Sequence, residues 1–187
     1  MVNHLVYEDL EDVIIVGWSY GTMVITGVAD RVPERIRSLV YLDGIVPRDG
    51  QSFYDADAWS DAERAEDWAK AEAAGMPGFE PPSSAERMQQ RFPEIDDAEW
   101  IAARMTPHPL ATLAQPVRSQ HPGAAALPRA FILCTADKTW EDIPFYQIID
   151  QIKTDPTWQY REVNVSHIGP LVTPEPVATV LLNLIDG

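Results

Sequence analysis

The sequence predicts an α/β fold, in which a mainly parallel sheet carries an inserted helical lid. An apolar run at residues 13–16 is followed by the turn Gly17-Trp18-Ser19-Tyr20-Gly21 and then by a helix-like segment. A second apolar run follows at residues 36–42. Strand, helix and strand within about 30 residues form a βαβ unit, whose strands are parallel with a right-handed crossover. Two more apolar runs, separated by a helical segment, follow residue 130.

Length and composition favour one domain over residues 1–187. Hydrophobic residues make up 45% of the chain, enough for a sizeable core. The net charge of −15 argues against binding to nucleic acid or to an anionic membrane, since both are negative. No apolar stretch approaches the roughly 18 residues of a membrane span, and no signal peptide opens the chain, so the predicted location is the cytoplasm. The single cysteine, Cys134, excludes a disulfide framework and predicts a buried thiol.

The first half of the predicted sheet has clear boundaries. The first strand, residues 13–16, is bounded by Gly17, and a helix follows over residues 22–31 because Pro33 lies just beyond its end. The second strand, residues 36–42, stops at Asp43-Gly44.

Residues 47–115 differ in character and are predicted to form the helical lid. Helical segments at residues 57–74, 84–92 and 96–105 are separated by breaks rich in proline and glycine. Their large apolar side chains predict a lid core, with some of them lining the pocket that the lid covers. These side chains are Trp59, Trp68, Phe79, Met88, Phe92, Trp100 and Met105.

The sheet resumes after the lid. A third strand is predicted at residues 130–134, a helix at 143–152 and a fourth strand at 160–165, which leads into Ser166-His167. The last helix is predicted over residues 174–185, with Pro174 or Pro176 tolerated in its first turn.

Ser19 is the predicted nucleophile. A strand, G-x-S-x-G and a helix in this order are typical of a nucleophile elbow, in which the serine occupies a sharp turn at the sheet edge. Such a turn leaves little room for side chains at Gly17 and Gly21. The backbone N–H of Tyr20 would lie at the helix N-terminus and stabilise an oxyanion.

His167 is the predicted base. It follows the last strand, at the sheet edge where Ser19 lies, and an imidazole titrates near working pH. The order Ser, acid, His is typical of hydrolases with this elbow, and it fits His167 best. His4, His108 and His121 lie beside prolines or near the terminus and are predicted surface groups.

Two aspartates are candidates for the acid that orients the imidazole. Asp137 follows the third strand and Asp43 follows the second, so both lie at the expected edge. Asp137 is favoured because it immediately precedes the last strand–helix unit, and Asp43 remains the alternative. Glu141 and Asp142 are predicted to be solvated or helix-capping groups.

These stretches resemble the α/β-hydrolase superfamily, and more closely the plant methyl-ester esterases, hydroxynitrile lyases and bacterial esterase relatives. The resemblance covers residues 13–52, 105–118, 131–147 and 163–178, most of the chain outside the lid. It implies a triad of Ser19, His167 and Asp137, the last from its C-T-x-D-K segment, Cys134 to Lys138.

The chain departs from that family pattern at three positions. Trp18 stands where the esterases usually carry histidine and would shape the floor of the substrate pocket, and Thr22 stands where they carry a second glycine. The lyases carry a lysine directly after the triad histidine to stabilise cyanide. Ile168 occupies that position, which argues against lyase activity.

Members of the family have several strands before the elbow, whereas this chain has about a dozen residues there. The resemblance therefore implies a partial fold, without the first four strands, the first helix and the loop that donates a second oxyanion N–H. Loss of one such donor typically costs about 10²–10³ in kcat. The strand Val13-Ile14-Ile15-Val16 would become an exposed edge that binds a second copy or a missing N-terminal segment.

The expected function is that of a serine carboxylesterase acting on small to medium uncharged esters. The alternative is a binding or accessory protein with an incomplete oxyanion hole. No cofactor or metal is expected, because the histidines lack metal-ligand spacing and no G-x-G-x-x-G motif is present.

Overall fold

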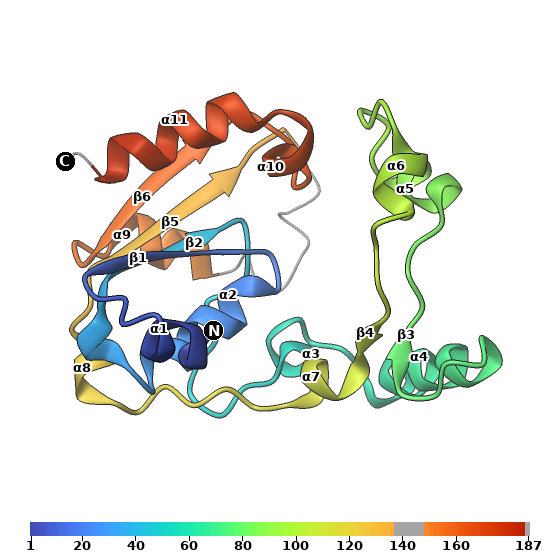
Figure 1. Cartoon of the computed structure of the whole chain (residues 1–187), viewed down its shortest axis with the longest axis horizontal. Helices are drawn as coiled ribbons and strands as arrows, with labels where there is room; N and C mark the ends of the chain where they lie inside the picture. Colours follow the sequence, from blue (N-terminus) through green and yellow to red (C-terminus); the bar gives the residue numbers. More distant parts are fainter. Residues whose placement is uncertain (137–147, 186–187) are drawn as a thin grey trace.

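The computed structural model describes residues 1–136 and 148–185. Its main sheet has four parallel strands in the order β1-β2-β5-β6 (Figure 1). The strands are β1 (Val13–Trp18), β2 (Ile36–Leu42), β5 (Arg129–Cys134) and β6 (Trp158–Val163). Because the strands are parallel, the segments that follow them meet at one edge of the sheet. Ser19, Asp43 and His167 all belong to those segments.

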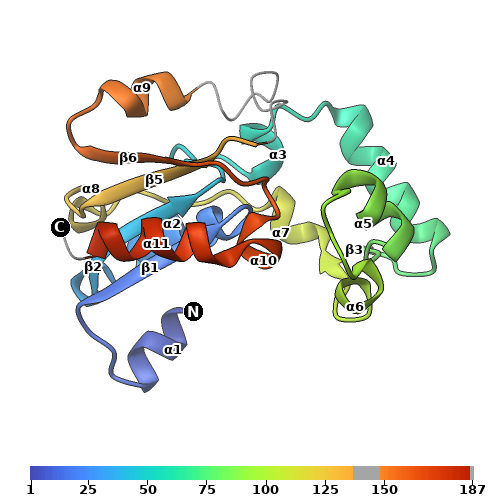
Figure 2. The ribbon, with the colours of Figure 1, turned by 90° about the horizontal axis from the view of Figure 1, so that it is seen from above.

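Helices pack on both faces of this sheet (Figure 2). One core lies on the side of α1 (Val2–Tyr7), α2 (Gly21–Ala29) and α9 (Ile149–Thr154), with Ile25, Phe131 and Leu133 at its centre. The other core lies under α11 (Pro174–Ile185), which contributes Val177. Short turns complete this part, namely η1 (Pro33–Arg35), α8 (Pro122–Ala125) and α10 (Gly169–Val172).

The segment between β2 and β5 extends to one side of the sheet (Figures 1 and 2). Two antiparallel two-residue strands, β3 (Phe79–Glu80) and β4 (His108–Pro109), pair within it. Beyond that pair lie α5 (Ala85–Arg91) and α6 (Ala98–Ala102), which contact each other. The remaining helices are α3 (Phe53–Ala56), α4 (Asp61–Ala73) and α7 (Leu110–Ala114).

Local hydrogen bonds explain where the elements differ from expectation. The helix expected from residue 57 begins at Asp61, because Ser60 caps it and accepts a hydrogen bond from the Glu63 N–H. The strand expected at residues 160–165 ends at Val163, where the chain turns and the Val165 N–H bonds the Val163 carbonyl at 2.9 Å.

Other expectations are met or fall partly outside the described residues. β2 and α11 have the predicted bounds, and Cys134 is buried as predicted. The expected helix at 143–152 falls partly outside the described residues, which show its last part as α9.

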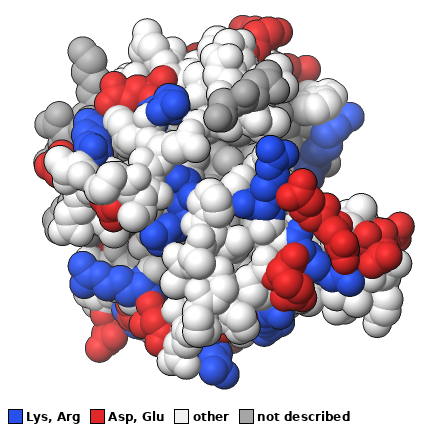
Figure 3. Space-filling view, turned by 90° about the vertical axis from the view of Figure 1, so that its left-hand side faces the viewer, with Lys and Arg blue, Asp and Glu red and all other residues white. Residues whose placement is uncertain are grey.

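Charge is spread over the surface of the molecule. Figure 3 shows one face on which basic and acidic side chains are interspersed with uncharged ones, without a continuous basic area among its described residues. None of the helices within residues 1–136 and 148–185 is both long enough and apolar enough to cross a membrane.

Candidate active site

Ser19 occupies a strained turn between β1 and α2. Its φ of 54° lies in the left-handed region, which non-glycine residues rarely adopt. Two backbone bonds hold the turn, because the Ser19 N–H donates to the Leu42 carbonyl and the Ser19 carbonyl accepts from Thr22 N–H, both at 3.1 Å. The elbow is thereby tied to the neighbouring strand β2 and to its own helix.

Of the two elbow glycines, only Gly17 lies so close to described neighbouring backbone that a side chain is excluded. A Cβ on Gly17 would lie 2.6 Å from the Gly21 carbonyl oxygen, so no side chain fits there. A Cβ on Gly21 would meet no described atom within 4 Å. The expectation of a crowded position is therefore confirmed at Gly17 and wrong at Gly21 within the described part of the chain, since the turn presses the backbone against one side only.

Thr22 braces the elbow from inside. Its side chain is fully buried, and its hydroxyl donates to the Ser19 carbonyl at 2.7 Å. Gly44 lies opposite, where a Cβ would come within 2.4 Å of the Ser19 carbonyl oxygen. The threonine that replaces the family's second glycine thus fixes the serine backbone.

The structure brings His167 to Ser19. The imidazole Nε2 lies 3.0 Å from the Ser19 Oγ, although 148 positions separate the two residues in the chain. The indole N–H of Trp18 donates to the His167 carbonyl at 3.0 Å. The expected place of Trp18 in the pocket floor stays a prediction, whereas this bond anchors the backbone of the histidine.

Asp43 holds the other side of the imidazole. Its Oδ2 lies 2.6 Å from His167 Nδ1, and its Oδ1 accepts a hydrogen bond from the Cys134 N–H at 3.0 Å. The carboxylate is almost completely buried, at 2% exposure. When Nδ1 carries the proton and donates a hydrogen bond to Asp43, Nε2 is the ring nitrogen that can accept the Ser19 hydroxyl proton.

Asp137, which sequence favoured as the acid, lies outside the described residues, so its role stays a prediction. Asp43 was the alternative, and it has a φ of 45° in the turn after β2. That turn directs its side chain toward His167, a consequence of backbone conformation that residue spacing does not reveal.

The other three histidines lie elsewhere. His121 Nδ1 accepts a hydrogen bond from the Gly123 N–H at the start of α8, and His4 is exposed on α1. His108 is half-buried, and its Nε2 lies 2.8 Å from the Thr112 hydroxyl oxygen. His108 was expected at the surface, but the β3–β4 pair and the Tyr20 ring, 5.1 Å away between centroids, partly cover it.

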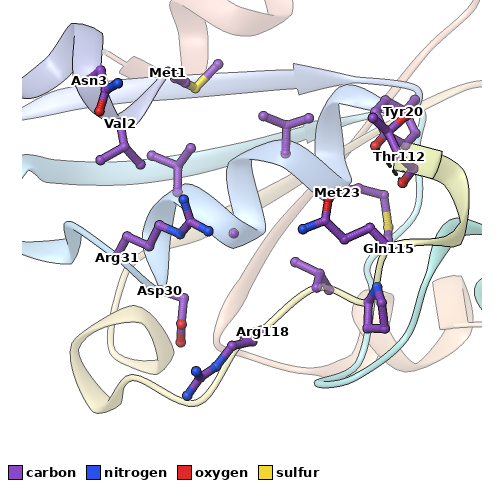
Figure 4. A pocket seen from close by; sticks show the side chains of 15 residues that line it. Met1, Val2, Asn3, Tyr20, Met23, Asp30, Arg31, Thr112, Gln115 and Arg118 are labelled. Carbon is purple, nitrogen blue, oxygen red and sulfur yellow. Dashed lines mark hydrogen bonds between the residues drawn. The ribbon is translucent and has the colours of Figure 1, made fainter. Parts of the chain in front are cut away.

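Tyr20 lies at the N-cap position, just before the elbow helix α2. Its N–H donates to no described backbone or side-chain group, and its expected role as an oxyanion donor stays a prediction. Its hydroxyl donates to the Thr112 carbonyl at 3.0 Å, which ties the ring to α7 (Figure 4).

A groove of about 560 Å³ runs beside α2, on the side of the Tyr20 ring (Figure 4). Its walls come from the N-terminus, α2 and the segment after α7, and include Met1, Met23 and Arg118. Ser19 does not line it, so this groove is distinct from the space above the serine hydroxyl. The described residues contain no cluster of three or more His, Cys, Asp or Glu side chains arranged to hold a metal ion.

The sequence reasoning predicted no contact for Ser166 and Ile168, which flank His167, or for Glu94, which contacts Ser166. The Ser166 hydroxyl donates to a carboxylate oxygen of Glu94, which lies between α5 and α6. Ile168 is buried in a cluster with Met88 and Ile95 from the same part of the chain. The sequence gives no signal for these contacts, because they join segments about 70 residues apart through long-range packing.

The family model for the alpha/beta hydrolase family matches residues 2–180. This chain belongs to that family. A carbendazim hydrolyzing esterase from Nocardioides sp. (strain SG-4G) is 35% identical over 182 residues, which cover 95% of this chain and 73% of that enzyme. The esterase-type relationship supports a hydrolase enzyme, as the sequence predicted.

Solved structures support the same fold. An extracellular alpha/beta-hydrolase from a Paenibacillus species, described as homologous to tobacco salicylic acid binding protein 2, aligns with a TM-score of 0.73 at 22% identity. The alignment covers all of this chain and 76% of that one. Tomato methylketone synthase I aligns with a TM-score of 0.68 at 17% identity, covering 99% of this chain and 77% of the synthase. These likenesses confirm the fold class.

Proposed function

We propose that this chain is a serine carboxylesterase that acts on small to medium uncharged esters. The observation that carries the proposal is the pair of contacts made by His167, at 3.0 Å to Ser19 Oγ and 2.6 Å to Asp43 Oδ2. A serine hydroxyl becomes a competent nucleophile when an oriented imidazole accepts its proton. The esterase relative supports the reaction class.

In the proposed mechanism, Ser19 Oγ attacks the ester carbonyl while His167 Nε2 takes the hydroxyl proton. Asp43 keeps the imidazole in the required tautomer and stabilises its cation. The N–H of Tyr20 donates to the oxyanion. His167 then protonates the leaving alcohol, and a water molecule activated by the same imidazole releases the acyl group from Ser19.

The segment over residues 47–115 is proposed to act as a lid. Its α5 and α6 pack against Ile168, beside the base, and Trp18 contacts the same cluster. Trp18 and the apolar side chains of α5 and α6 would then favour uncharged substrates near the site. Chemistry without a cofactor and a cytoplasmic location remain predictions from the sequence.

Covalent labelling tests the nucleophile. We expect a fluorophosphonate to label Ser19, and Ser19→Ala to abolish both labelling and hydrolysis of a chromogenic short-chain ester. Thr26→Ser, which keeps the hydroxyl of a buried α2 residue, is the matched control and should label normally. Ester binding without labelling would instead favour the accessory-protein alternative, and activity retained by Ser19→Ala would refute the proposed role of Ser19.

A further inference from the structure

Both chain neighbours of His167 are held by the same unit, α5 and α6 with their connection. Ser166 is 9% exposed, and its hydroxyl donates to the Glu94 carboxylate. A hydrogen bond to a carboxylate is charge-assisted and about twice as strong as a neutral one. It therefore ties the residue before the imidazole to the connection between α5 and α6.

Apolar packing holds the residue on the other side. Ile168 is 7% exposed and lies in a cluster with Met88 from α5, Ala98 from α6 and Ile95 between them. The carboxylate of Glu94 and the side chain of Ile95 are adjacent in the chain, so one short connection contacts both flanks of His167.

We infer that the α5–α6 unit positions the base, and that Glu94 is a positioning residue that acts on His167 through Ser166. This inference rests on the proposed role of His167. Ser166 and His167 are joined by one peptide bond, so their Cα atoms are held about 3.8 Å apart. A shift of the Ser166 backbone therefore also moves the backbone that carries the imidazole. A misplacement of about 1 Å in such a site can cost about 10²-fold in rate. Placement of the unit against Ser166 and Ile168 therefore favours the geometry in which Nε2 faces Ser19.

Substitutions at Glu94 separate this role from general stability. Glu94→Gln keeps an oxygen that can accept the Ser166 hydrogen bond, and we expect its labelling rate with a fluorophosphonate to stay close to that of the wild type. Glu94→Leu removes the acceptor and should slow labelling by about 10-fold, with kcat reduced and KM little changed. Asp96→Ala removes a carboxylate from the same connection and is the matched control, expected to behave as the wild type.

A second variant keeps the test valid if Glu94→Leu folds poorly. Ser166→Ala removes the donor and should give the same loss, and the double variant should lose no more than either single one, because all three delete one interaction. Additive losses, or wild-type rates in Ser166→Ala and Glu94→Leu, would overturn the inference.

A readout without turnover separates this inference from the proposed function. The proton between His167 Nδ1 and Asp43 Oδ2, across 2.6 Å, should give a far-downfield NMR signal. We expect that signal in the wild type and in Glu94→Gln, and a broadened or lost signal in Glu94→Leu. An unchanged signal in Glu94→Leu would refute positioning by Glu94 even if the wild type did not label, whereas a wild type that fails to label would contradict the esterase proposal alone.

Discussion

At the residue scale, Trp18 contacts His167 through both its indole N–H and its ring. Its indole N–H donates to the His167 carbonyl at 3.0 Å, and its ring lies 5.8 Å from the imidazole between centroids. The elbow residue just before the nucleophile therefore also holds the backbone of the proposed base. The sequence predicted a place for Trp18 in the site but could not predict this bond. The bond depends on the fold, which brings the end of β1 and the segment after β6 together at one edge of the sheet.

Replacing Trp18 by phenylalanine tests the bond while keeping an aromatic ring. We expect Trp18→Phe to lower the fluorophosphonate labelling rate by about 3- to 10-fold, because a typical hydrogen bond contributes about 0.5–1.5 kcal/mol. Trp68→Phe, on α4 and 40% exposed, is the control and should leave the rate unchanged. Equal rates in the two variants would show that the indole N–H does not position His167.

The acid can be assigned by comparing two aspartates. Asp43→Asn places an amide beside His167 Nδ1 and favours the wrong tautomer, so we expect kcat for a chromogenic short-chain ester to fall by a factor on the order of 10³–10⁴. Asp137→Asn is the matched comparison. A large loss in Asp137→Asn with near-normal activity in Asp43→Asn would restore the assignment that sequence favoured.

At the scale of elements, the elbow turn excludes a side chain at the glycine before Ser19 but not at the glycine after it. Gly17→Ala would press a Cβ against the Gly21 carbonyl, so we expect urea unfolding to show a loss of about 1–3 kcal/mol in stability. A Cβ at Gly21, the first residue of α2, would meet no described atom within 4 Å. Gly21→Ala should therefore leave stability unchanged or raise it by up to about 1 kcal/mol, because alanine favours a helix more than glycine does. The reverse order of stabilities would contradict this account of the turn.

The elements that the sequence predicts well are those specified by local pattern. Continuous apolar runs bounded by turns located all four strands of the main sheet, and prolines indicated the end of α2 and the start of α11. The pair β3–β4 was missed because each strand has two residues and β4 contains Pro109, so no alternation is visible. The choice between Asp43 and Asp137 also lay beyond local pattern, since both follow strands at the same edge.

The N-terminus of α3 gives a pH-dependent contribution to stability. Hydrogen bonds from Ser52, with help from Arg64, lower the pKa of Asp55 to about 2. Since the folded-state pKa lies below the ordinary value of 3.8, this stabilisation is present above that value and is lost as pH falls toward about 2. Asp55→Asn should therefore lower the urea midpoint at neutral pH and reduce its fall between about pH 4 and pH 2.

The control for Asp55 is Asp61→Asn, at the first position of α4, whose side chain accepts no hydrogen bond from any described residue. We expect its acid-induced fall in urea midpoint to match that of the wild type. An identical pH dependence in Asp55→Asn and the wild type would show that the Ser52–Asp55 capping box contributes no pH-dependent stability.

At the scale of the whole molecule, the two outer strands of the described sheet differ in how well their side chains discourage the addition of another strand. β6 carries Arg161 and Glu162, and Lys153 forms an ion pair with Glu162 at 3.3 Å. β1 reads Val-Ile-Ile-Val before its glycine, and Val16 is 40% exposed. Charged side chains discourage strand addition, and an apolar edge favours it. The fold relatives extend beyond the region they share with this chain, which covers 76% of the Paenibacillus hydrolase.

We propose that in a solution of the purified chain the β1 edge pairs with β1 of a second copy. A two-fold axis would make the contact self-complementary and would satisfy the outward-facing N–H and carbonyl groups of both strands. Light scattering should then give a mass that rises with concentration, and Val16→Lys should give a monomer because it places a charge on the edge. Gln159→Lys puts the same charge on β6 and should associate as the wild type does. A wild-type chain that stays monomeric at all concentrations would refute pairing through β1, and equal dissociation by both lysine variants would assign the association to charge rather than to this edge.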